Sequence, residues 1–578
     1  MTSPKNSRSL SRPLIVQSDL TLLLAVDEPL YEEARNALLG FAELVKAPEH
    51  VHTYRISPLS IWNARAAGIE ATEILEAIES YSRYPVPDTI RQAVTDFAHR
   101  YGRIEIRRDM ADNQTGHRPP ARLVLETDDQ RLADLLESDD TFDDLLRRTS
   151  GCGFSLAAKD RGRLKLALVR AGYPARDVAG YASGRPLEVS LRTRSQRDGA
   201  PFMLRDYQRQ AVDAFYASGG PQGGSGVVVL PCGAGKTIVA IAVMAAVGSE
   251  TLVLTTSTTA LRQWRDEILD KTRIEPEQIG EYSGAEKTVR PVTLSTYQML
   301  THRRRRDDDF RHLELLDHER WGLIVYDEVH LLPAPVFQAT AGIQARRRLG
   351  LTATLVREDN REEDVFALIG PKKVDVPWKV LERQGWVAEA KCIEIRVPLG
   401  EELAGEYSLA PRRRRFRIAA ENPLKAGLVR QILDHHSGEP ALIMGLYLDQ
   451  VESLAAELGL PLLTGKTPVA ERQRLYDDFR RGRLRGLVVS KVANFAVDLP
   501  DAALAVQVSG SFGSRQEEAQ RLGRLLRPKA GANQAHFYTL VSRDTLEQEF
   551  ALNRQRFLCE QGYAYEILEA ATFREDRR

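Results

Sequence analysis

The chain has 578 residues, of which 43% are hydrophobic and 28% are charged. This length predicts several domains, and the composition excludes collagen-like, disulfide-stapled and wholly disordered proteins. The 80 basic and 80 acidic residues give a net charge of zero, so any binding of nucleic acid would depend on local basic patches. The four cysteines lie at least 80 positions apart, which predicts neither a zinc clamp nor a local disulfide framework and is typical of a reducing compartment.

The first expected domain is a small α+β unit over residues 1–112. Its expected elements are strands at 14–16 and 21–26 and helices at 59–67, 72–82 and 88–100. Between them, Asp27 can cap a helix whose apolar face consists of Leu30, Ala34, Leu38, Phe41 and Val45. Residues 110–120 are expected to form a linker, because they combine Asn113, Gly116 and two prolines.

A second small α+β domain is expected over residues 121–190. It opens with a strand at 122–126 and continues into an acidic helix, with nine acids against one arginine between Glu126 and Leu146. An anionic face of this kind repels phosphate. We therefore do not expect this surface to grip a nucleic acid.

Apolar strands and helical patterns alternate from residue 202 to the end of the chain. The strands are expected at 226–230, 251–255, 323–326, 441–444, 486–490 and 504–508. Such alternation predicts parallel sheets, and its length requires two of them, over 202–372 and 373–578. The predicted fold class is α/β, with two parallel-sheet domains that follow two small α+β domains.

A nucleotide site is predicted where the first of these strands ends. The sequence VVVLPCGAGKT (227–237) runs from a strand through a glycine-rich turn into an apolar helix at 238–247. Glycines let backbone N–H groups approach phosphate oxygens, Lys236 would reach the β- and γ-phosphates, and Thr237 would place its hydroxyl on Mg²⁺. The match is incomplete, because Leu230 stands where the full pattern has a glycine. The predicted nucleotide-binding residues of this turn are Leu230, Pro231, Cys232, Gly233, Ala234, Gly235, Lys236 and Thr237.

The tripeptide Gly-Lys-Thr recurs at 465–467, also after a strand. This second copy lacks the upstream glycines. We interpret it as a surface turn.

The sequence YDEVH (326–330) closes the apolar strand at 323–326. A carboxylate pair at the carboxyl end of a parallel strand lies where nucleotides bind in such sheets. Asp327 then fits as a ligand of Mg²⁺, and Glu328 as the base that orients the attacking water. The alternative is an acidic loop with a chance histidine, and the P-loop upstream makes this alternative the weaker one.

Six motifs occur in one order: LRDYQ (204–208), LPCGAGKT (230–237), STYQ (295–298), DEVH (327–330), LTAT (351–354) and QRLGRLLR (520–527). This set resembles superfamily 2 helicases and translocases. LGLTATLVRED (349–359) and GSRQEEAQRLGRLLRPK (513–529) resemble, more narrowly, the XPB family of DNA repair helicases. HVHTYRISPLSIWNARAAGI (50–69) is similar to the domain that precedes the motor in that family. The resemblance covers essentially the whole chain, which would be a minimal form of bacterial or archaeal type.

The resemblance implies two RecA-like motor domains with ATP bound between them. Gln208 would read the adenine edge, with Arg205 and Gln520 as further nucleotide-binding residues. Arg524 and Arg527 would enter from the second motor domain as arginine fingers, and their i, i+3 spacing puts both on one helix face.

The resemblance also implies residues that contact DNA or couple it to ATP. Domain 121–190 takes the place of a damage-recognition-like domain. Arg357, Glu358 and Asp359 resemble the RED motif assigned to strand separation, and a thumb-like insert that grips DNA is expected around 405–424. The implied DNA and coupling residues are Thr296, Thr352, Thr354, Arg357, Glu358, Asp359, Arg412, Arg413, Arg414 and Arg415.

We expect two histidine pairs and two tryptophans to have structural rather than functional roles. The histidine pairs 50/52 and 435/436 have no visible third ligand, so core or surface positions are expected rather than metal sites. Trp264 and Trp386 are expected to pack in the core.

The predicted function is that of an ATP-dependent DNA helicase or translocase in DNA repair, with ATP and Mg²⁺ as cofactors. Only the resemblance implies 3′→5′ polarity. The expected partners are DNA, as a single strand, fork or duplex, and a nuclease as a candidate. A cytoplasmic, nucleoid-associated monomer without membrane segments is expected. Two alternatives stay open: a double-strand translocase that does not separate strands, and an ATP-switched scaffold that recruits a nuclease.

Overall fold

The structure is a computed structural model that describes most of the chain. The described residues are 12–46, 50–109, 122–149, 151–179, 184–219, 223–231, 233–302, 312, 315, 321–331, 347–353, 362–376, 378–490, 502–510, 533–560, 563 and 565–575. The chain divides into two compact units, of which the first holds residues 1–45, 50–230 and 235–376, and the second holds 46–49, 231–234 and 377–578. The expected linker at 110–120 lies outside the described residues.

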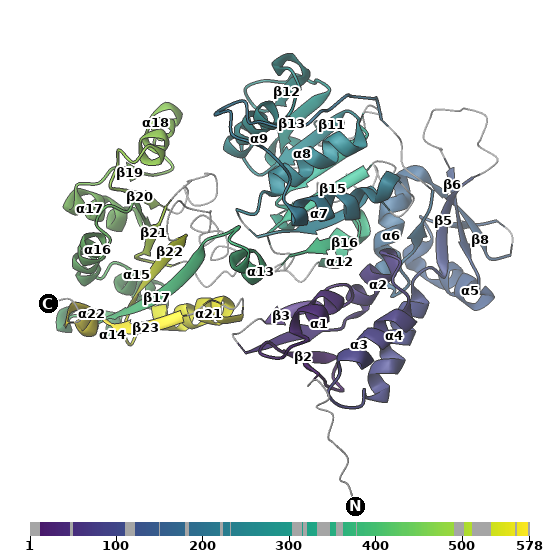
Figure 1. Cartoon of the computed structure of the whole chain (residues 1–578), viewed down its shortest axis with the longest axis horizontal. Helices are drawn as coiled ribbons and strands as arrows, with labels where there is room; N and C mark the ends of the chain where they lie inside the picture. Colours follow the sequence, from purple (N-terminus) through teal and green to yellow (C-terminus); the bar gives the residue numbers. More distant parts are fainter. Residues whose placement is uncertain are drawn as a thin grey trace, which may run out of the picture. The chain divides into compact units, whose positions relative to one another are not determined.

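The first small domain packs helices on a four-stranded sheet of order β1-β2-β4-β3 (Figure 1). Its elements are β1 (Leu14–Val16), β2 (Thr21–Ala25), α1 (Tyr31–Leu38), β3 (Glu43–Lys46), β4 (Val51–Arg55), α2 (Pro58–Ala66), α3 (Ala71–Tyr81) and α4 (Asp88–Arg100). The prediction of one helix from Asp27 to Val45 is wrong. The helix begins after Leu30 without a side-chain cap and ends at Leu38, because Gly40 disfavours a longer helix and residues 43–46 join the sheet edge instead.

The second small domain holds a five-stranded sheet of order β7-β8-β6-β5-β9. Its elements are β5 (Ile104–Arg108), β6 (Arg122–Thr127), α5 (Gln130–Ser138), β7 (Arg147–Arg148), β8 (Gly153–Ala157), α6 (Arg161–Arg170) and β9 (Arg176–Asp177). Strand β5 precedes the boundary that we placed after residue 112, yet it pairs antiparallel with β6 along its whole length. The sheet therefore begins before that boundary.

The acidic segment at 126–146 is not one long helix. Helix α5 ends at Ser138, and a short 3₁₀ turn follows because Phe142 turns into the apolar core. Arg103 pairs with two of the nine acids, Asp128 and Asp129, and Arg148 pairs with Asp134 and Glu137. Arg107 pairs with a fifth, Glu126, at 3.1 Å, so five of the nine negative charges are offset by arginines of the same domain.

The first α/β domain is built on a seven-stranded sheet of order β12-β13-β11-β14-β15-β10-β16, in which every described pair is parallel. Its elements are α7 (Asp206–Tyr216), β10 (Ser225–Val229), α8 (Lys236–Val247), β11 (Thr251–Thr255), α9 (Thr258–Lys271), β12 (Ile279–Tyr282), β13 (Val292–Thr296), α10 (Tyr297–Leu300), β14 (Leu323–Asp327), β15 (Arg347–Thr352), α12 (Glu362–Leu368) and β16 (Lys372–Asp375). The five inner strands are almost wholly buried, as strands with helices on both faces must be, whereas the edge strands β12 and β16 are partly exposed. The predicted strands at 226–230, 251–255 and 323–326 are confirmed.

The second α/β domain also has a seven-stranded, all-parallel sheet, of order β19-β20-β18-β21-β22-β17-β23. Its elements are α13 (Trp378–Arg383), β17 (Glu389–Val397), α14 (Glu401–Leu409), α15 (Arg412–Ala420), α16 (Leu424–His435), β18 (Ala441–Gly445), α17 (Leu448–Leu458), β19 (Leu462–Leu463), α18 (Val469–Arg480), β20 (Gly486–Ser490), β21 (Leu504–Gln507), β22 (Gln534–Ser542), α21 (Leu546–Glu560), β23 (Tyr565–Glu569) and α22 (Ala570–Glu575). The predicted α/β class with two parallel sheets is confirmed.

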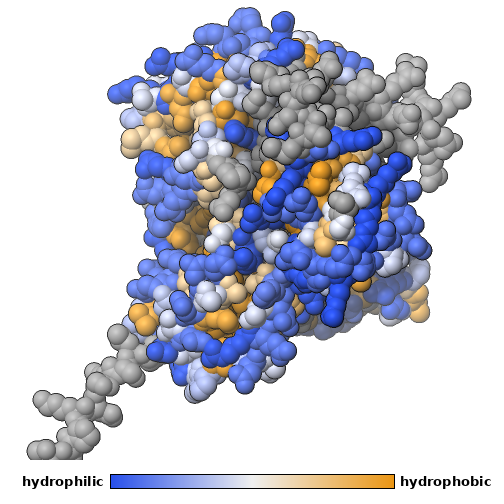
Figure 2. Space-filling view, turned by 90° about the vertical axis from the view of Figure 1, so that its right-hand side faces the viewer, coloured by the Kyte–Doolittle hydropathy of each residue, from blue (hydrophilic) through white to orange (hydrophobic). Residues whose placement is uncertain are grey.

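The described surface is mainly polar. On the face drawn in Figure 2, hydrophilic residues cover most of the described area, and hydrophobic ones gather in separate patches. Among the helices that the structure describes, none combines the length and the apolar character needed to cross a bilayer.

Candidate nucleotide site

The predicted phosphate-binding turn lies between strand β10 and helix α8. Gly233 and Gly235 both have φ of +81°, a conformation that glycine adopts without strain. A Cβ atom on Gly235 would lie 2.6 Å from the Nε2 atom of Gln208. Gly235 is the N-cap of α8, which begins at Lys236, two residues before the predicted start at 238. The unpaired N–H groups of the first helical turn therefore lie at the glycine-rich turn.

Lys236 and the two acidic residues of DEVH come together as predicted. Asp327 is the last residue of β14 and Glu328 follows it, while β10 and β14 both flank β15. The carboxyl ends of these parallel strands therefore meet at one edge of the sheet. There the Nζ atom of Lys236 lies 3.0 Å from Oε1 of Glu328, with both side chains mostly buried.

The surroundings shift the pKa values of Asp327 and Glu328 in opposite directions. Burial and the nearby Glu328 raise the pKa of Asp327 to about 6. Burial also acts to raise the pKa of Glu328, but Lys236 and His330 outweigh it and hold this pKa below its usual range. Glu328 is therefore ionised at neutral pH, as a base must be, whereas Asp327 is the group that gains most from a cation.

Glu328 also carries backbone strain. Its φ is +50°, and a non-glycine residue in the left-handed region is disfavoured by about 1–3 kcal/mol. The backbone N–H of Ala353 donates a hydrogen bond to the Glu328 carboxylate. Contacts with Ala353 and Lys236 together hold the carboxylate at the turn.

The motifs DEVH and LTAT are joined directly. The Nδ1 atom of His330 lies 2.8 Å from the hydroxyl oxygen of Thr352, with both residues buried, and 3.5 Å from Oε2 of Glu328. Thr352, the last residue of β15, therefore contacts the histidine that adjoins the predicted base. Thr354 lies outside the described residues.

Trp264 is a site residue that sequence reasoning missed. Its indole Nε1–H donates to Oδ2 of Asp327 at 2.9 Å, and the residue is 2% exposed. The prediction that Trp264 packs in the core is confirmed, but no sequence signal linked α9 to β14. Trp386, for which we made the same prediction, is 38% exposed, and there the prediction is wrong.

Three other predicted residues of the first unit are buried or held by local contacts. The side-chain oxygen of Gln208 accepts the backbone N–H of Arg205 at 3.0 Å, at the start of α7. The Arg205 guanidinium donates to the Tyr207 hydroxyl at 3.0 Å. Thr296, at the end of β13, is buried and its hydroxyl accepts the N–H of Met299.

The oxygen donors at this edge of the sheet suit Mg²⁺. Mg²⁺ prefers hard oxygen ligands such as carboxylates, hydroxyls and phosphates. Thr237 in the first turn of α8 and Asp327 at the end of β14 supply a hydroxyl and a carboxylate. The raised pKa of Asp327 fits a position where a cation is expected.

Comparisons with known proteins decide the family. The chain is 51% identical over 558 residues to the DNA 3′-5′ helicase XPB of Mycobacterium tuberculosis, covering 96% of this chain and 98% of that protein. It is 51% identical over 559 residues to the DNA 3′-5′ helicase XPB of Kineococcus radiotolerans, with 96% of each chain covered. It is 30% identical over 575 residues to the XPB subunit of general transcription and DNA repair factor IIH of Encephalitozoon cuniculi, covering 96% and 83%. The chain belongs to the XPB family of DNA helicases.

Three family models match the chain in agreement with this conclusion. The model for the ERCC3/RAD25/XPB C-terminal helicase matches residues 381–578, and the model for the res subunit of type III restriction enzymes matches 201–357. A helicase conserved C-terminal domain model matches residues 14–150. Membership in the XPB family confirms the predicted enzyme class, an ATP-dependent DNA helicase with two RecA-like domains.

The XPB-like elements of the second unit are described only in part. The predicted thumb-like insert is a pair of helices, α14 and α15, and the four predicted arginines form the first turn of α15.

Several predicted site residues of both units lie outside the described residues: Cys232, Arg357, Glu358, Asp359, Gln520, Arg524 and Arg527.

Proposed function

We propose that this chain couples hydrolysis of Mg-ATP to 3′→5′ movement along DNA and to opening of the duplex, in DNA repair. The observation that carries the proposal is the meeting of Lys236, Asp327 and Glu328 at one edge of a parallel sheet, in a chain of the XPB family. The polarity is taken from its relatives, which are described as DNA 3′-5′ helicases.

The ion pair between Lys236 and Glu328 supports a specific order of events. The Nζ atom of Lys236 lies 3.0 Å from Oε1 of Glu328. A bound nucleotide offers phosphate oxygens with more negative charge, so Lys236 is expected to move to the β- and γ-phosphates. Glu328, released from the ion pair, then orients and deprotonates the attacking water.

Asp327 and Thr237 are the residues that we propose to hold Mg²⁺. The ion, when bound, would neutralise charge on the phosphates. Trp264 acts as a positioning residue, because its N–H fixes one carboxylate oxygen of Asp327 and leaves the other for the ion. When Glu328 loses its ion pair with Lys236, the contact between His330 and Thr352 would transmit this change from DEVH to LTAT.

From the second motor domain, we propose Arg524 and Arg527 as arginine fingers. Such residues stabilise charge in the transition state and contribute about 10³–10⁵-fold to kcat. Replacement of either by alanine should lower kcat far more than nucleotide affinity. An unchanged kcat in both variants would mean that these arginines have no part in hydrolysis.

The arginines of α15 are proposed to contact DNA, and the structure divides them into two kinds. Arg414 pairs with Glu406 at 2.6 Å, and Arg415 donates to the backbone oxygens of Ser408 and Ala410. Arg412 and Arg413 are exposed, and within the described part of the chain no ion pair holds either. We therefore assign the phosphate contacts to Arg412 and Arg413, and the stability of the α14–α15 pair to the other two.

This assignment predicts different salt dependences for two double variants. Arg412→Gln/Arg413→Gln should flatten the plot of log affinity against log salt by up to about 0.9 per lost phosphate contact on duplex DNA. The matched variant Arg414→Gln/Arg415→Gln should leave this slope unchanged. Equal slopes in all three proteins would contradict a DNA contact at α15.

Arg357, Glu358 and Asp359 are proposed to separate the strands, as the RED motif does in the family. Replacing all three by alanine should lower unwinding of a forked duplex several-fold while DNA-stimulated ATPase activity persists. Joint loss of both activities would indicate coupling instead.

The experiment that tests the function as a whole compares tailed duplexes. We expect ATPase activity stimulated by DNA and unwinding of a 3′-tailed but not a 5′-tailed substrate. Stimulated ATPase with displacement of a third strand from duplex DNA, but without unwinding, would favour a double-strand translocase. ATP-dependent recruitment of a nuclease without either motor activity would favour the scaffold.

A further inference from the structure

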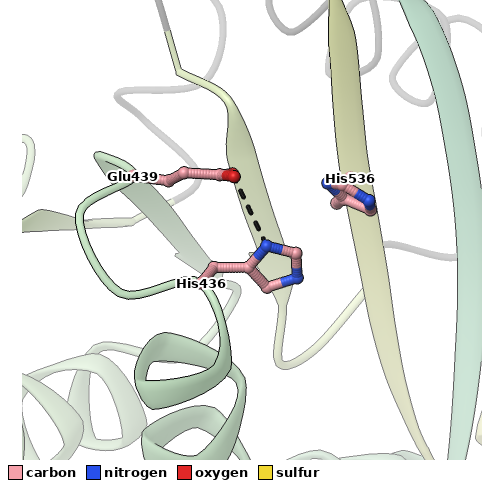
Figure 3. Close-up of side chains that lie close together, drawn as sticks. All are labelled: His436, Glu439 and His536. Carbon is pink, nitrogen blue, oxygen red and sulfur yellow. Dashed lines mark ion pairs between the residues drawn. The ribbon is translucent and has the colours of Figure 1, made fainter. Parts of the chain in front are cut away.

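Two histidines and a glutamate converge in the second unit, at the amino-terminal edge of its parallel sheet. Figure 3 shows His436, Glu439 and His536, and one ligand atom of each lies within 4.8 Å of the others. Two of them come from the turn between α16 and β18, and the third from strand β22. We did not expect a metal site at His435 and His436 because the sequence shows no third ligand nearby, and the fold supplies it.

The turn after α16 brings Glu439 back onto His436. His436 caps the helix and its N–H donates to Ile432 O. The N–H of Glu439 then donates to His436 O at 3.0 Å, and Gly438 between them has φ of +98°. The Glu439 carboxylate consequently lies 3.5 Å from Nδ1 of the His436 ring.

Strand β22 supplies both the third ligand and a residue that orients the first. His536 and Tyr538 are two positions apart on one strand, so their side chains lie on the same face of the sheet. The Tyr538 hydroxyl lies 3.0 Å from Nε2 of His436. With Nε2 engaged by a hydroxyl, the Nδ1 atom of His436 is the one directed toward Glu439, which is the arrangement typical of metal-ligating histidines.

The position of the cluster suits a cation. It lies at the carboxyl end of the 12-residue helix α16, where the helix dipole favours positive charge. Lys391 lies level with His536 on the adjacent strand, but it is exposed and its ammonium can extend into solvent.

We propose that His436, Glu439 and His536 bind a divalent transition-metal ion of the zinc class. Imidazole nitrogens with one carboxylate are donors that Zn²⁺ and Co²⁺ accept, with water in a fourth position. In a tetrahedral site with ligands about 2.0–2.1 Å from the metal, the ligand atoms lie about 3.3 Å apart, so the cluster must close slightly around the ion. The Glu439 side chain is 41% exposed, which gives it freedom to move and the ion a path to enter.

The proposed ion would join helix α16 to strand β22 within the second motor domain. Its ligands lie where β18 begins, whereas in parallel sheets of this kind nucleotides bind beyond the carboxyl ends of the strands. The ion is thus distinct from the catalytic Mg²⁺, and its expected effect is on the stability of this domain.

Spectroscopic titration of the full chain with Co²⁺, without nucleotide, tests the proposal. The metal-free wild type should gain visible d–d absorption bands on binding, and Zn²⁺ should displace the Co²⁺. The variant His536→Gln should bind one equivalent less, and Glu439→Gln should bind this equivalent at least about tenfold more weakly. His435→Gln removes an exposed neighbouring histidine outside the cluster, and it should behave as the wild type does.

Two results would overturn the proposal. One is equal Co²⁺ stoichiometry and affinity in the wild type, His536→Gln and Glu439→Gln. The other is absence of binding above the metal-free baseline in the wild type. If circular dichroism shows that His536→Gln does not fold, Glu439→Gln decides alone, because its exposed side chain can change without disturbing the core.

Discussion

The chain contains the tripeptide Gly-Lys-Thr twice, and the structure places the two copies in opposite settings. In the first copy Gly235 has positive φ and caps a 12-residue helix, and Lys236 reaches a carboxylate on another strand. In the second copy Gly465 does not have positive φ, and Lys466 is exposed.

The polar groups of the second copy form hydrogen bonds within their own turn. The hydroxyl of Thr467 accepts the N–H of Thr464 at 3.0 Å, and the N–H of Lys466 donates to the Thr464 hydroxyl at 3.2 Å. The following helix, α18, has Pro468 as its N-cap. The prediction of a surface turn is thereby confirmed.

The comparison shows that the tripeptide Gly-Lys-Thr does not by itself make a phosphate-binding site. The first copy has glycines that open the turn, a helix whose N–H groups begin at the turn, and an acidic pair on a nearby strand. The second has a single glycine without positive φ, and the helix after it begins only beyond Pro468. The chemistry comes from convergence of several elements, and the following substitutions test each in turn.

The largest difference is expected between the two lysines. Lys236→Ala should abolish ATPase activity, by about 10³-fold or more, because the turn loses the cation that neutralises the β- and γ-phosphates. Lys466→Ala, the matched variant, should keep wild-type activity. Steady-state ATPase assays with DNA measure both, and substantial activity in Lys236→Ala would refute the site.

A smaller effect is expected at the proposed base. Glu328→Gln should lower kcat by about 10²-fold or more, because an amide cannot accept the proton of the attacking water. Nucleotide affinity should stay equal or rise, since Lys236 loses its ion-pair partner. Turnover and the binding of a non-hydrolysable analogue are measured on one preparation, and weaker binding with normal kcat would contradict the assigned role.

The two glycines should differ by about tenfold in nucleotide affinity. Gly235→Ala places a Cβ 2.6 Å from Gln208 at a φ of +81°, and such strain is worth about 1–3 kcal/mol. Gly465→Ala should leave affinity and stability unchanged to within about 0.5 kcal/mol. Equal analogue binding by both variants would show that the turn adapts to a side chain.

The smallest effect is expected at Trp264. Trp264→Phe keeps an aromatic ring but removes the N–H that fixes Asp327, so the Mg²⁺ concentration for half-maximal ATPase should rise about three- to tenfold. The exposed Trp386→Phe is the control. A fall in kcat without a change in Mg²⁺ dependence would assign Trp264 a packing role only.

The sequence alone determined the fold class and the centre of the nucleotide site. Apolar strands alternating with helical periods specify parallel sheets, because buried strands and amphipathic helices are local patterns. Parallel strands end at one edge, so a P-loop after one strand and DEVH after another had to converge. Lys236 and Glu328 lie where that rule places them.

The tertiary structure decided which distant side chains meet. No local pattern relates Trp264 to Asp327, His330 to Thr352, or His536 to His436, because each contact depends on how separate elements pack. The same holds for β5, which pairs across a boundary that composition suggested. A local pattern fixes periodicity and strand ends, while strand order and helix packing fix the partners of each side chain.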